Sequence, residues 1–141
     1  MSSLRNRLVE TALEWEARFG NAPQITTVIS EYDAAMLIGL SEVEYSESMS
    51  GVSAVQKGFD FVHRGIRYQV KGNRPSGKPG SRVTLVPKAT NYHWDILIWV
   101  HYNRLYEIQE AWKWEVSKYR NAFHEVKRLS PDHYRAGTKL A

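Results

Sequence analysis

The stretch "FDFVHRGIRYQVKG", residues 59–72, decides the fold, because apolar and polar residues alternate on both sides of Arg64-Gly65. Two alternating runs around a two-residue turn that ends in glycine are typical of a β-hairpin, since glycine readily adopts the positive φ that the turn requires. Counting outward from the turn places Asp60 opposite Gln69. The sequence therefore predicts an antiparallel hairpin over these residues.

The alternation sorts the side chains of this hairpin onto two faces. The polar face holds Asp60, Gln69 and Lys71. Opposed side chains have Cβ atoms about 4.5 to 5.5 Å apart, which is close enough for an acid and an amide to bind one ion. The apolar face, which we expect to contact the core, holds Phe59, Phe61, Ile66, Tyr68 and Val70.

Helical periodicity precedes the hairpin. Apolar residues recur at helical spacing over residues 3–19 and predict an amphipathic helix there. A second helix is predicted to follow, with Glu31 towards its middle and Gly39 as its stop. The polar segment 41–58 is not expected to form a long element.

Three further strands are predicted after the hairpin. The run "RVTLV", residues 82–86, indicates a third strand. "DILIWVHY", residues 95–102, is almost continuously apolar and indicates a central strand that is buried on both faces. A turn after it leads into "LYEI", residues 105–108, as a further strand.

Two helices are predicted to close the chain. The spacing of Trp112, Val116 and Tyr119 indicates the first, and residues 130–132 form the capped start of a short second one. We expect one α/β (α+β) domain over residues 1–141, with a mixed central sheet of about four to five strands flanked by helices.

Charge is unevenly distributed along the chain. The 141 residues carry a net charge of +4, and the segment 31–47 holds five acidic residues and no Lys or Arg. The basic segment 64–88 would attract polyanions. A solvated loop is an equally good interpretation of the same pattern. The chain has no cysteine, which excludes disulfides and thiolate metal sites and favours a cytoplasmic, intracellular location. The segment 64–88 has no acidic residue and holds Arg64, Arg67, Lys71, Arg74, Lys78, Arg82 and Lys88.

The polar face of the hairpin is suited to a divalent cation. Mg²⁺, for which Mn²⁺ is a possible substitute, prefers oxygen ligands and leaves positions for water and phosphate oxygens. Asp60 would supply charge, the Gln69 side-chain carbonyl a neutral oxygen, and the backbone carbonyl of Val70 a third oxygen. Lys71 would orient or deprotonate the attacking water. The alternative is that Asp60 and Gln69 are polar residues on a solvated face.

The arrangement of Asp60, a hairpin turn and Gln69-Val70-Lys71 resembles the active-site hairpin of the PD-(D/E)xK, or restriction-endonuclease-like, nuclease superfamily. The segment "SEYDAAMLIGL" is similar to the helix that supplies a glutamate in that family, here Glu31. The resemblance covers residues from about 30 to 108. Gln69 stands where the family has an acid.

The resemblance implies a restriction-endonuclease-like core and a metal-dependent DNA endonuclease of the restriction, homing or repair type. Its catalytic residues would be Glu31, Asp60, Gln69 and Lys71. A double-stranded DNA partner has two strands related by a two-fold axis, so we expect a homodimer or higher homo-oligomer. We expect no membrane association. The candidate DNA-binding residues are Arg64, Arg67, Arg74, Lys78, Arg82 and Lys88.

Two other functions stay open. A non-catalytic nucleic-acid-binding module that keeps the fold is favoured by Gln69, because an amide binds a cation less strongly than a carboxylate. A basic protein-interaction domain is the third possibility. The segment "GNRPSGK", residues 72–78, nearly spells a phosphate-binding P-loop, but Pro79 follows its lysine and no helix is predicted after it, so we reject that reading.

Overall fold

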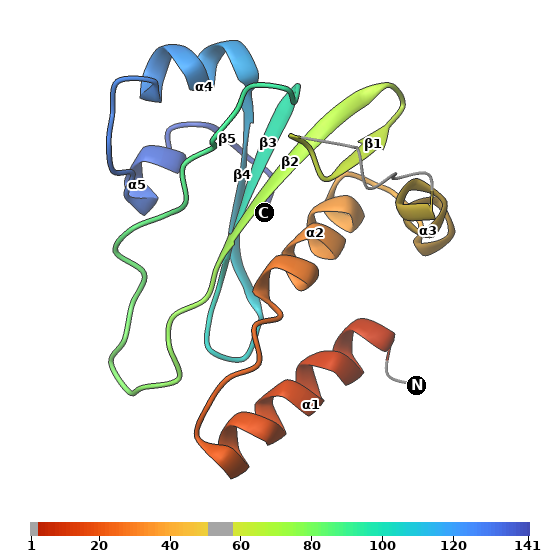
Figure 1. Cartoon of the computed structure of the whole chain (residues 1–141), viewed down its shortest axis with the longest axis vertical. Coiled ribbons are helices and arrows are strands. Elements are labelled where there is room, and N and C mark those ends of the chain that lie inside the picture. The colour runs from red at the N-terminus through yellow and green to blue at the C-terminus, as the bar shows by residue number, and fades with distance from the viewer. Residues whose placement is uncertain (1–2, 51–57) are drawn as a thin grey trace.

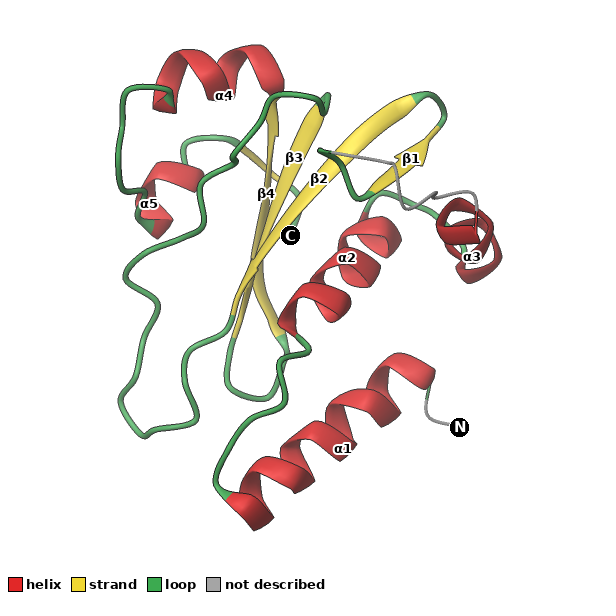
Figure 2. Ribbon diagram, viewed as in Figure 1, coloured by secondary structure: helices red, strands yellow, loops and turns green. Residues whose placement is uncertain are grey.

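The structure is a computed structural model that describes residues 3–50 and 58–141. Over these residues the chain forms five helices and one five-stranded sheet, so the α/β class and the size of the sheet are confirmed (Figures 1 and 2). Within the same residues, no helix is both long and apolar enough to span a membrane. The helices are α1 (Leu4–Phe19), α2 (Thr26–Leu37), α3 (Glu42–Ser50), α4 (Val116–Phe123) and α5 (Pro131–Tyr134). The strands are β1 (Phe61–His63), β2 (Ile66–Asn73), β3 (Ile96–Tyr102), β4 (Ile108–Glu115) and β5 (Thr138–Lys139).

The strands lie in the sheet in the order in which they occur in the chain, β1-β2-β3-β4-β5. β2 and β3 run parallel, whereas β1–β2, β3–β4 and β4–β5 are antiparallel, so the predicted mixed sheet is confirmed. β3 is the central strand, and the side chains of Leu97, Ile98, Trp99 and Val100 are fully buried on its two faces.

Each face of the sheet is covered by its own hydrophobic core. α1, α2 and α3 lie on one side of the sheet, and α4 and α5 lie on the other (Figure 2). On the α2 side, Ile29 and Ala34 pack with Phe61, Tyr68 and Val70. The opposite core holds Trp94, Trp99, Trp114, Tyr119 and Tyr134.

The expected helix boundaries are largely confirmed. Ser3 caps α1 by accepting a hydrogen bond from the backbone of Asn6, and Gly20 ends the helix in a left-handed conformation at φ 83°. α5 begins with a capping box between Ser130 and His133. The segment 41–58 contains the short helix α3, and its residues 51–57 lie outside the described part.

The predicted strand at 82–86 is wrong. Residues 74–95 cross over from β2 to β3 without a helix or a strand, and Val86 forms a single antiparallel bridge with Leu129. Val86 is buried in the core beneath α4 and α5, while Leu85 is exposed. The apolar residues of this run therefore anchor an irregular crossover rather than build a strand.

Two boundaries after β3 are also corrected. The strand predicted at 105–108 begins at Ile108 and extends to Glu115, because Asn103 side-chain and backbone hydrogen bonds hold residues 103–107 in a turn. Trp112 consequently lies on β4 opposite Trp99, and α4 begins only at Val116.

Candidate active site

The β1–β2 hairpin is shorter than the alternation predicts. Its register is the expected one for three pairs and ends at Phe61 opposite Tyr68. The backbone N–H of Asp60 then donates to the Tyr68 carbonyl at 2.7 Å, so the chain leaves the regular ladder at Asp60. The prediction that Asp60 and Gln69 form a ladder pair is therefore wrong, although their side chains do meet.

The apolar face of the hairpin needs a similar correction. Phe61, Tyr68 and Val70 are buried in the core beneath α2, as expected. Phe59 packs instead against the core on the other side of the sheet, because the chain has left the ladder before it. Ile66, beside the turn, is 37% exposed.

The Asp60 carboxylate occupies the edge of β2 that β1 leaves open. Its Oδ2 accepts a hydrogen bond from the Val70 backbone N–H at 2.7 Å and one from the Gln69 Nε2 at 3.2 Å. The N–H and C=O of one residue in a strand point to the same edge, so the Val70 carbonyl also faces this edge. An acid, an amide and a backbone carbonyl are thus gathered at one point of the sheet.

Helix α2 brings Glu31 to the same place. Gly72 on β2 faces Ser30, and a Cβ at Gly72 would lie 2.6 Å from the Ser30 Cβ and Oγ. A glycine here lets the helix approach the strand closely, and the next residue of the helix is Glu31. The Glu31 carboxyl lies within hydrogen-bonding reach of Asp60.

The proximity of these two half-buried acids changes their titration. Burial, followed by the charge and the hydrogen bond of Asp60, raises the pKa of Glu31 to about 7. Burial also raises the pKa of Asp60, although the Val70 N–H and the charge of Lys71 act in the opposite direction. The two acids therefore hold a proton more tightly than isolated carboxyls do. Like charges held together in this way favour protonation or the binding of a cation.

Lys71 belongs to the same electrostatic environment. It follows Val70 on β2, lies opposite the buried Trp99 of β3, and is half-buried. Its charge lowers the pKa of Asp60, which places its ammonium group within electrostatic reach of the acid pair.

The donor set fits a hard divalent cation with few protein ligands. Glu31 and Asp60 supply two carboxylates, and Val70 supplies a neutral oxygen. In the structure the Nε2 of Gln69 points at Asp60. A rotation of the amide by 180° would point the side-chain carbonyl oxygen of Gln69 at the site of the cation instead. Within residues 3–50 and 58–141, no three His, Asp or Glu side chains lie close enough together to hold one metal ion. A cation at this site would therefore have two acidic ligands, and its other ligands would be neutral oxygens.

The six candidate DNA-binding residues fall into two groups. Arg64 is exposed at the tip of the hairpin with φ 52°, and Lys78 and Arg82 are exposed on the crossover. Arg67 is exposed as well, but it forms an ion pair with Asp95 at 3.1 Å. These four residues can reach a ligand in solvent.

The other two are engaged within the fold. The Arg74 side chain is 6% exposed, forms an ion pair with Glu16 at 3.0 Å and donates to the carbonyl of Arg104. The Lys88 ammonium donates to the backbone carbonyls of His124 and Val126. Both side chains hold the crossover against its neighbours, so we leave them out of the proposed DNA-binding surface.

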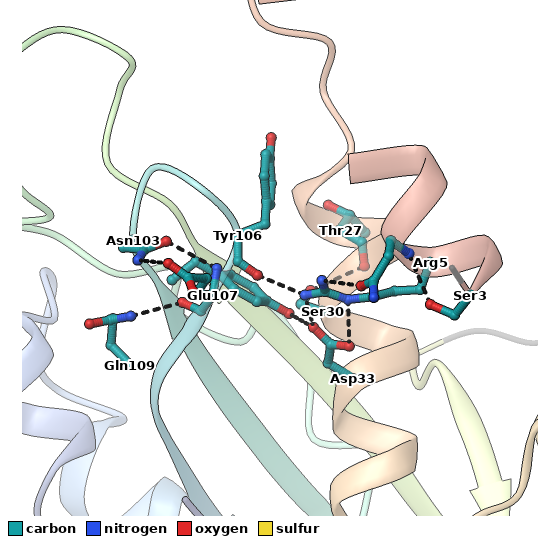
Figure 3. Close-up of polar contacts among 11 residues, drawn as sticks. Ser3, Arg5, Thr27, Ser30, Asp33, Asn103, Tyr106, Glu107 and Gln109 are labelled. Carbon is teal, nitrogen blue, oxygen red and sulfur yellow. Dashed lines mark hydrogen bonds and ion pairs between the residues drawn. The ribbon is translucent and has the colours of Figure 1, made fainter. Parts of the chain in front are cut away.

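A second acidic group on α2 was not singled out from the sequence. Arg5 donates to both carboxylate oxygens of Asp33, at 3.1 and 2.8 Å, and to the backbone carbonyl of Tyr106 (Figure 3). The hydroxyl of Tyr102 donates to Asp33 at 2.7 Å, and burial raises the pKa of Tyr102. This network ties α1, α2 and the turn after β3 together. Periodicity places Arg5 on α1 but does not reveal its partner 28 residues away.

Tyr45 is a further residue near the acid pair. It stands on α3 and packs edge-on against Phe61. Burial and the charges of Glu31 and Asp60 raise the pKa of Tyr45 to about 12. Tyr45 of α3 therefore lies within electrostatic reach of the acid pair, whereas the sequence predicted only a polar connection at 41–58.

Comparison with known proteins adds no further constraint. No protein-family model matches the sequence, and no curated protein matches it significantly.

Proposed function

We propose that the protein is a metal-dependent DNA endonuclease and that the Glu31–Asp60 pair is its metal-binding centre. The observation that carries the proposal is the contact between two half-buried carboxyls at an open strand edge, with the pKa of Glu31 raised to about 7. A structural acid pair of this kind opposes folding, because the fold must hold two like charges together. A bound cation would remove that cost.

The reaction class follows from the groups around the acids. A divalent ion held by Glu31, Asp60 and the Val70 carbonyl would supply Lewis acidity toward a phosphodiester and a site for water. Lys71 would orient the attacking water and offset the negative charge of the phosphate. Gln69 holds Asp60 by a hydrogen bond and has a carbonyl oxygen available for the same ion.

DNA is the substrate that the surrounding charge favours. Arg64 projects from the hairpin tip before the start of β2, and Lys78 and Arg82 project from the crossover after its end. Contacts of this type neutralise phosphates and release counterions. We therefore assign these three side chains to the DNA backbone.

The test compares two acid-to-amide variants. Asp60→Asn keeps the size of the side chain but removes the charge, and we expect it to lower Mg²⁺- or Mn²⁺-dependent cleavage of plasmid DNA by about 1,000-fold or more, since an essential charge in an active site is worth that much. DNA binding should persist. Asp132→Asn is the matched control, because Asp132 is 90% exposed at the start of α5.

Thermal unfolding gives an independent readout of the metal. Mg²⁺ should raise the melting temperature of the wild type and of Asp132→Asn but not of Asp60→Asn, because an ion that binds the folded state stabilises it. Cleavage by Asp60→Asn at the wild-type rate, or cleavage by the wild type in excess chelator, would rule out the proposed centre.

A non-catalytic nucleic-acid-binding module is the second candidate. The orientation of Gln69 favours it, because the amide N–H rather than an oxygen points at Asp60. This protein would bind DNA with the same salt dependence but would show neither cleavage nor a metal-dependent melting temperature. The two measurements above therefore separate the candidates.

A further inference from the structure

Helix α1 presents an exposed apolar stripe. Its inner face buries Val9 and Ala12, whereas Leu4, Leu8, Trp15 and Phe19 are 73%, 38%, 48% and 58% exposed. These four residues recur at helical spacing and form one line along the helix. α1 lies on the far side of α2 from the sheet (Figure 1). Large exposed apolar residues aligned along one helix in this way indicate an interaction surface.

The two halves of the stripe differ in shape. Trp15 and Phe19 project together at the C-terminal half, with ring centroids 4.6 Å apart. The N-terminal half borders a groove of about 360 Å³ between α1, α2 and α3. The apolar side chains that line the groove are Leu4, Leu8, Val28, Ile29, Tyr32 and Tyr45. One helix therefore carries both an aromatic projection and an apolar groove.

We propose that this stripe is a dimer interface, in which α1 packs antiparallel against α1 of a second copy of the chain. In that arrangement Phe19 of one copy lies beside Leu4 of the other, and Trp15 lies beside Leu8, because both pairs are centred on the same point of the helix. Each aromatic pair then enters the groove of the other copy. A two-fold interface must be self-complementary, and a projection and a groove at opposite ends of one helix satisfy this condition.

The charges beside the stripe match the same partner. In an antiparallel helix pair, residues on one flank meet residues of the same flank on the partner helix. Arg7 and Glu14 lie on the solvent flank of the stripe, where Glu14 also forms an exposed ion pair with Arg18 of its own helix at 3.9 Å. The antiparallel arrangement brings Arg7 of one copy near Glu14 of the other, twice in each dimer. Opposite charges across the interface favour a second copy over an apolar partner of unrelated sequence.

Sedimentation of the protein without DNA and without metal tests the interface separately from any nuclease activity. We expect a monomer–dimer equilibrium at micromolar concentrations, since one helix and one groove form an interface at the small end of the usual range. Trp15→Ala should weaken dimerisation by about 100-fold, because each dimer loses two buried aromatic anchors. Leu85→Ala is the control, since Leu85 is an apolar residue that is 54% exposed on the crossover and not on α1.

Charge reversal provides the decisive second measurement. Arg7→Glu and Glu14→Arg should each weaken dimerisation by about tenfold, and the double variant should restore it, because the pair across the two-fold axis is rebuilt with its charges exchanged. A wild type that stays monomeric at millimolar concentration, a Trp15→Ala variant that behaves like Leu85→Ala, or a double variant weaker than both single ones would each overturn the proposal.

Discussion

Helix α2 carries two acidic side chains two residues apart, and their surroundings are opposite in charge. Asp33 accepts two hydrogen bonds from Arg5 and one from Tyr102, so its charge is balanced inside the protein. Glu31 meets another acid, Asp60, and the pKa of Glu31 rises to about 7. A buried acid with a cationic partner stabilises the packing of the elements it joins. An acid pair opposes folding, and we propose that a bound cation offsets this cost.

The largest expected effect concerns Asp33, the acid whose charge is balanced by Arg5. Arg5→Ala leaves Asp33 buried without its cation, which should lower the free energy of unfolding by about 3 kcal/mol. Urea unfolding measures the change. Lys118→Ala is the control, because it removes only an exposed ion pair with Glu115 and should cost less than about 0.5 kcal/mol. Equal effects of the two variants would show that the Asp33 network contributes nothing special.

The second prediction concerns the close approach that positions Glu31. Gly72→Ala places a methyl group against Ser30, so helix and strand must separate, and we expect a loss of about 2 kcal/mol together with a weaker response of the melting temperature to Mg²⁺. Adding Ser30→Gly removes the clashing atoms and should recover part of the loss. If the effects of Gly72→Ala and Ser30→Gly on the free energy of unfolding simply add in the double variant, this contact does not set the distance between α2 and β2.

The third prediction contrasts the two acids directly by replacing each with its amide. Glu31→Gln should stabilise the metal-free protein at pH 8 by about 1 kcal/mol, after allowance for the partial exposure of the site. Asp33→Asn should destabilise it, because the bond to Arg5 loses its charge.

The pH dependence of this contrast has a fixed sign. The folded-state pKa of Glu31 is raised from 4.5 to about 7, so the folded protein holds the proton in that interval while the unfolded chain releases it. The free energy of unfolding therefore falls as the pH rises from about 4.5 to about 7 and levels off above. The advantage of Glu31→Gln should disappear near pH 4.5, and an advantage that persists there would contradict the assignment.

The smallest expected effect concerns the amide at the edge of the acid pair. Gln69→Glu adds a third carboxylate, which should lower the free energy of unfolding of the metal-free protein by about 0.5 kcal/mol. It should also lower the Mg²⁺ midpoint, that is, the Mg²⁺ concentration that gives half of the increase in melting temperature. Gln69→Ala should shift the midpoint upward, because it removes an oxygen ligand. Gln109→Glu, on the exposed start of β4, should leave the midpoint unchanged. Identical titrations of both Gln69 variants and the wild type would remove Gln69 from the site.

The features that the sequence predicts well are those set by neighbouring residues. The Arg64-Gly65 turn, the apolar run of β3 and the capped start of α5 each depend on a few adjacent side chains. The run 82–86 also has strand-like residues, yet only Val86 finds a backbone partner. Whether such a run becomes a strand depends on a distant edge with unpaired hydrogen-bonding groups, which local pattern does not reveal.

The candidate site shows the same division. Alternation places Gln69 and Lys71 on one face of β2, and the observed register agrees. The meeting of Glu31 with Asp60 was expected only through the resemblance to a nuclease family, because it depends on the close packing of Ser30 on Gly72. The same limit explains Phe59 and Trp112, whose faces were set by a break in one ladder and by the late start of α4.

The irregular crossover 74–95 determines the order in which the sheet can assemble. The β1–β2 and β3–β4 turns are short, so each hairpin can close within about 1–10 μs. The parallel pairing of β2 with β3 requires the two ends of the whole crossover to come together. Because the crossover contains no helix that would shorten it, and closing a longer loop costs more entropy, this pairing should form later than the hairpins. Trp99 marks this seam, because its Nε1 donates to Asn73 across the two strands at 2.8 Å. The fluorescence of Trp99 should therefore change in the slowest refolding phase, when the strand that carries Gln69 and Lys71 joins the central strand.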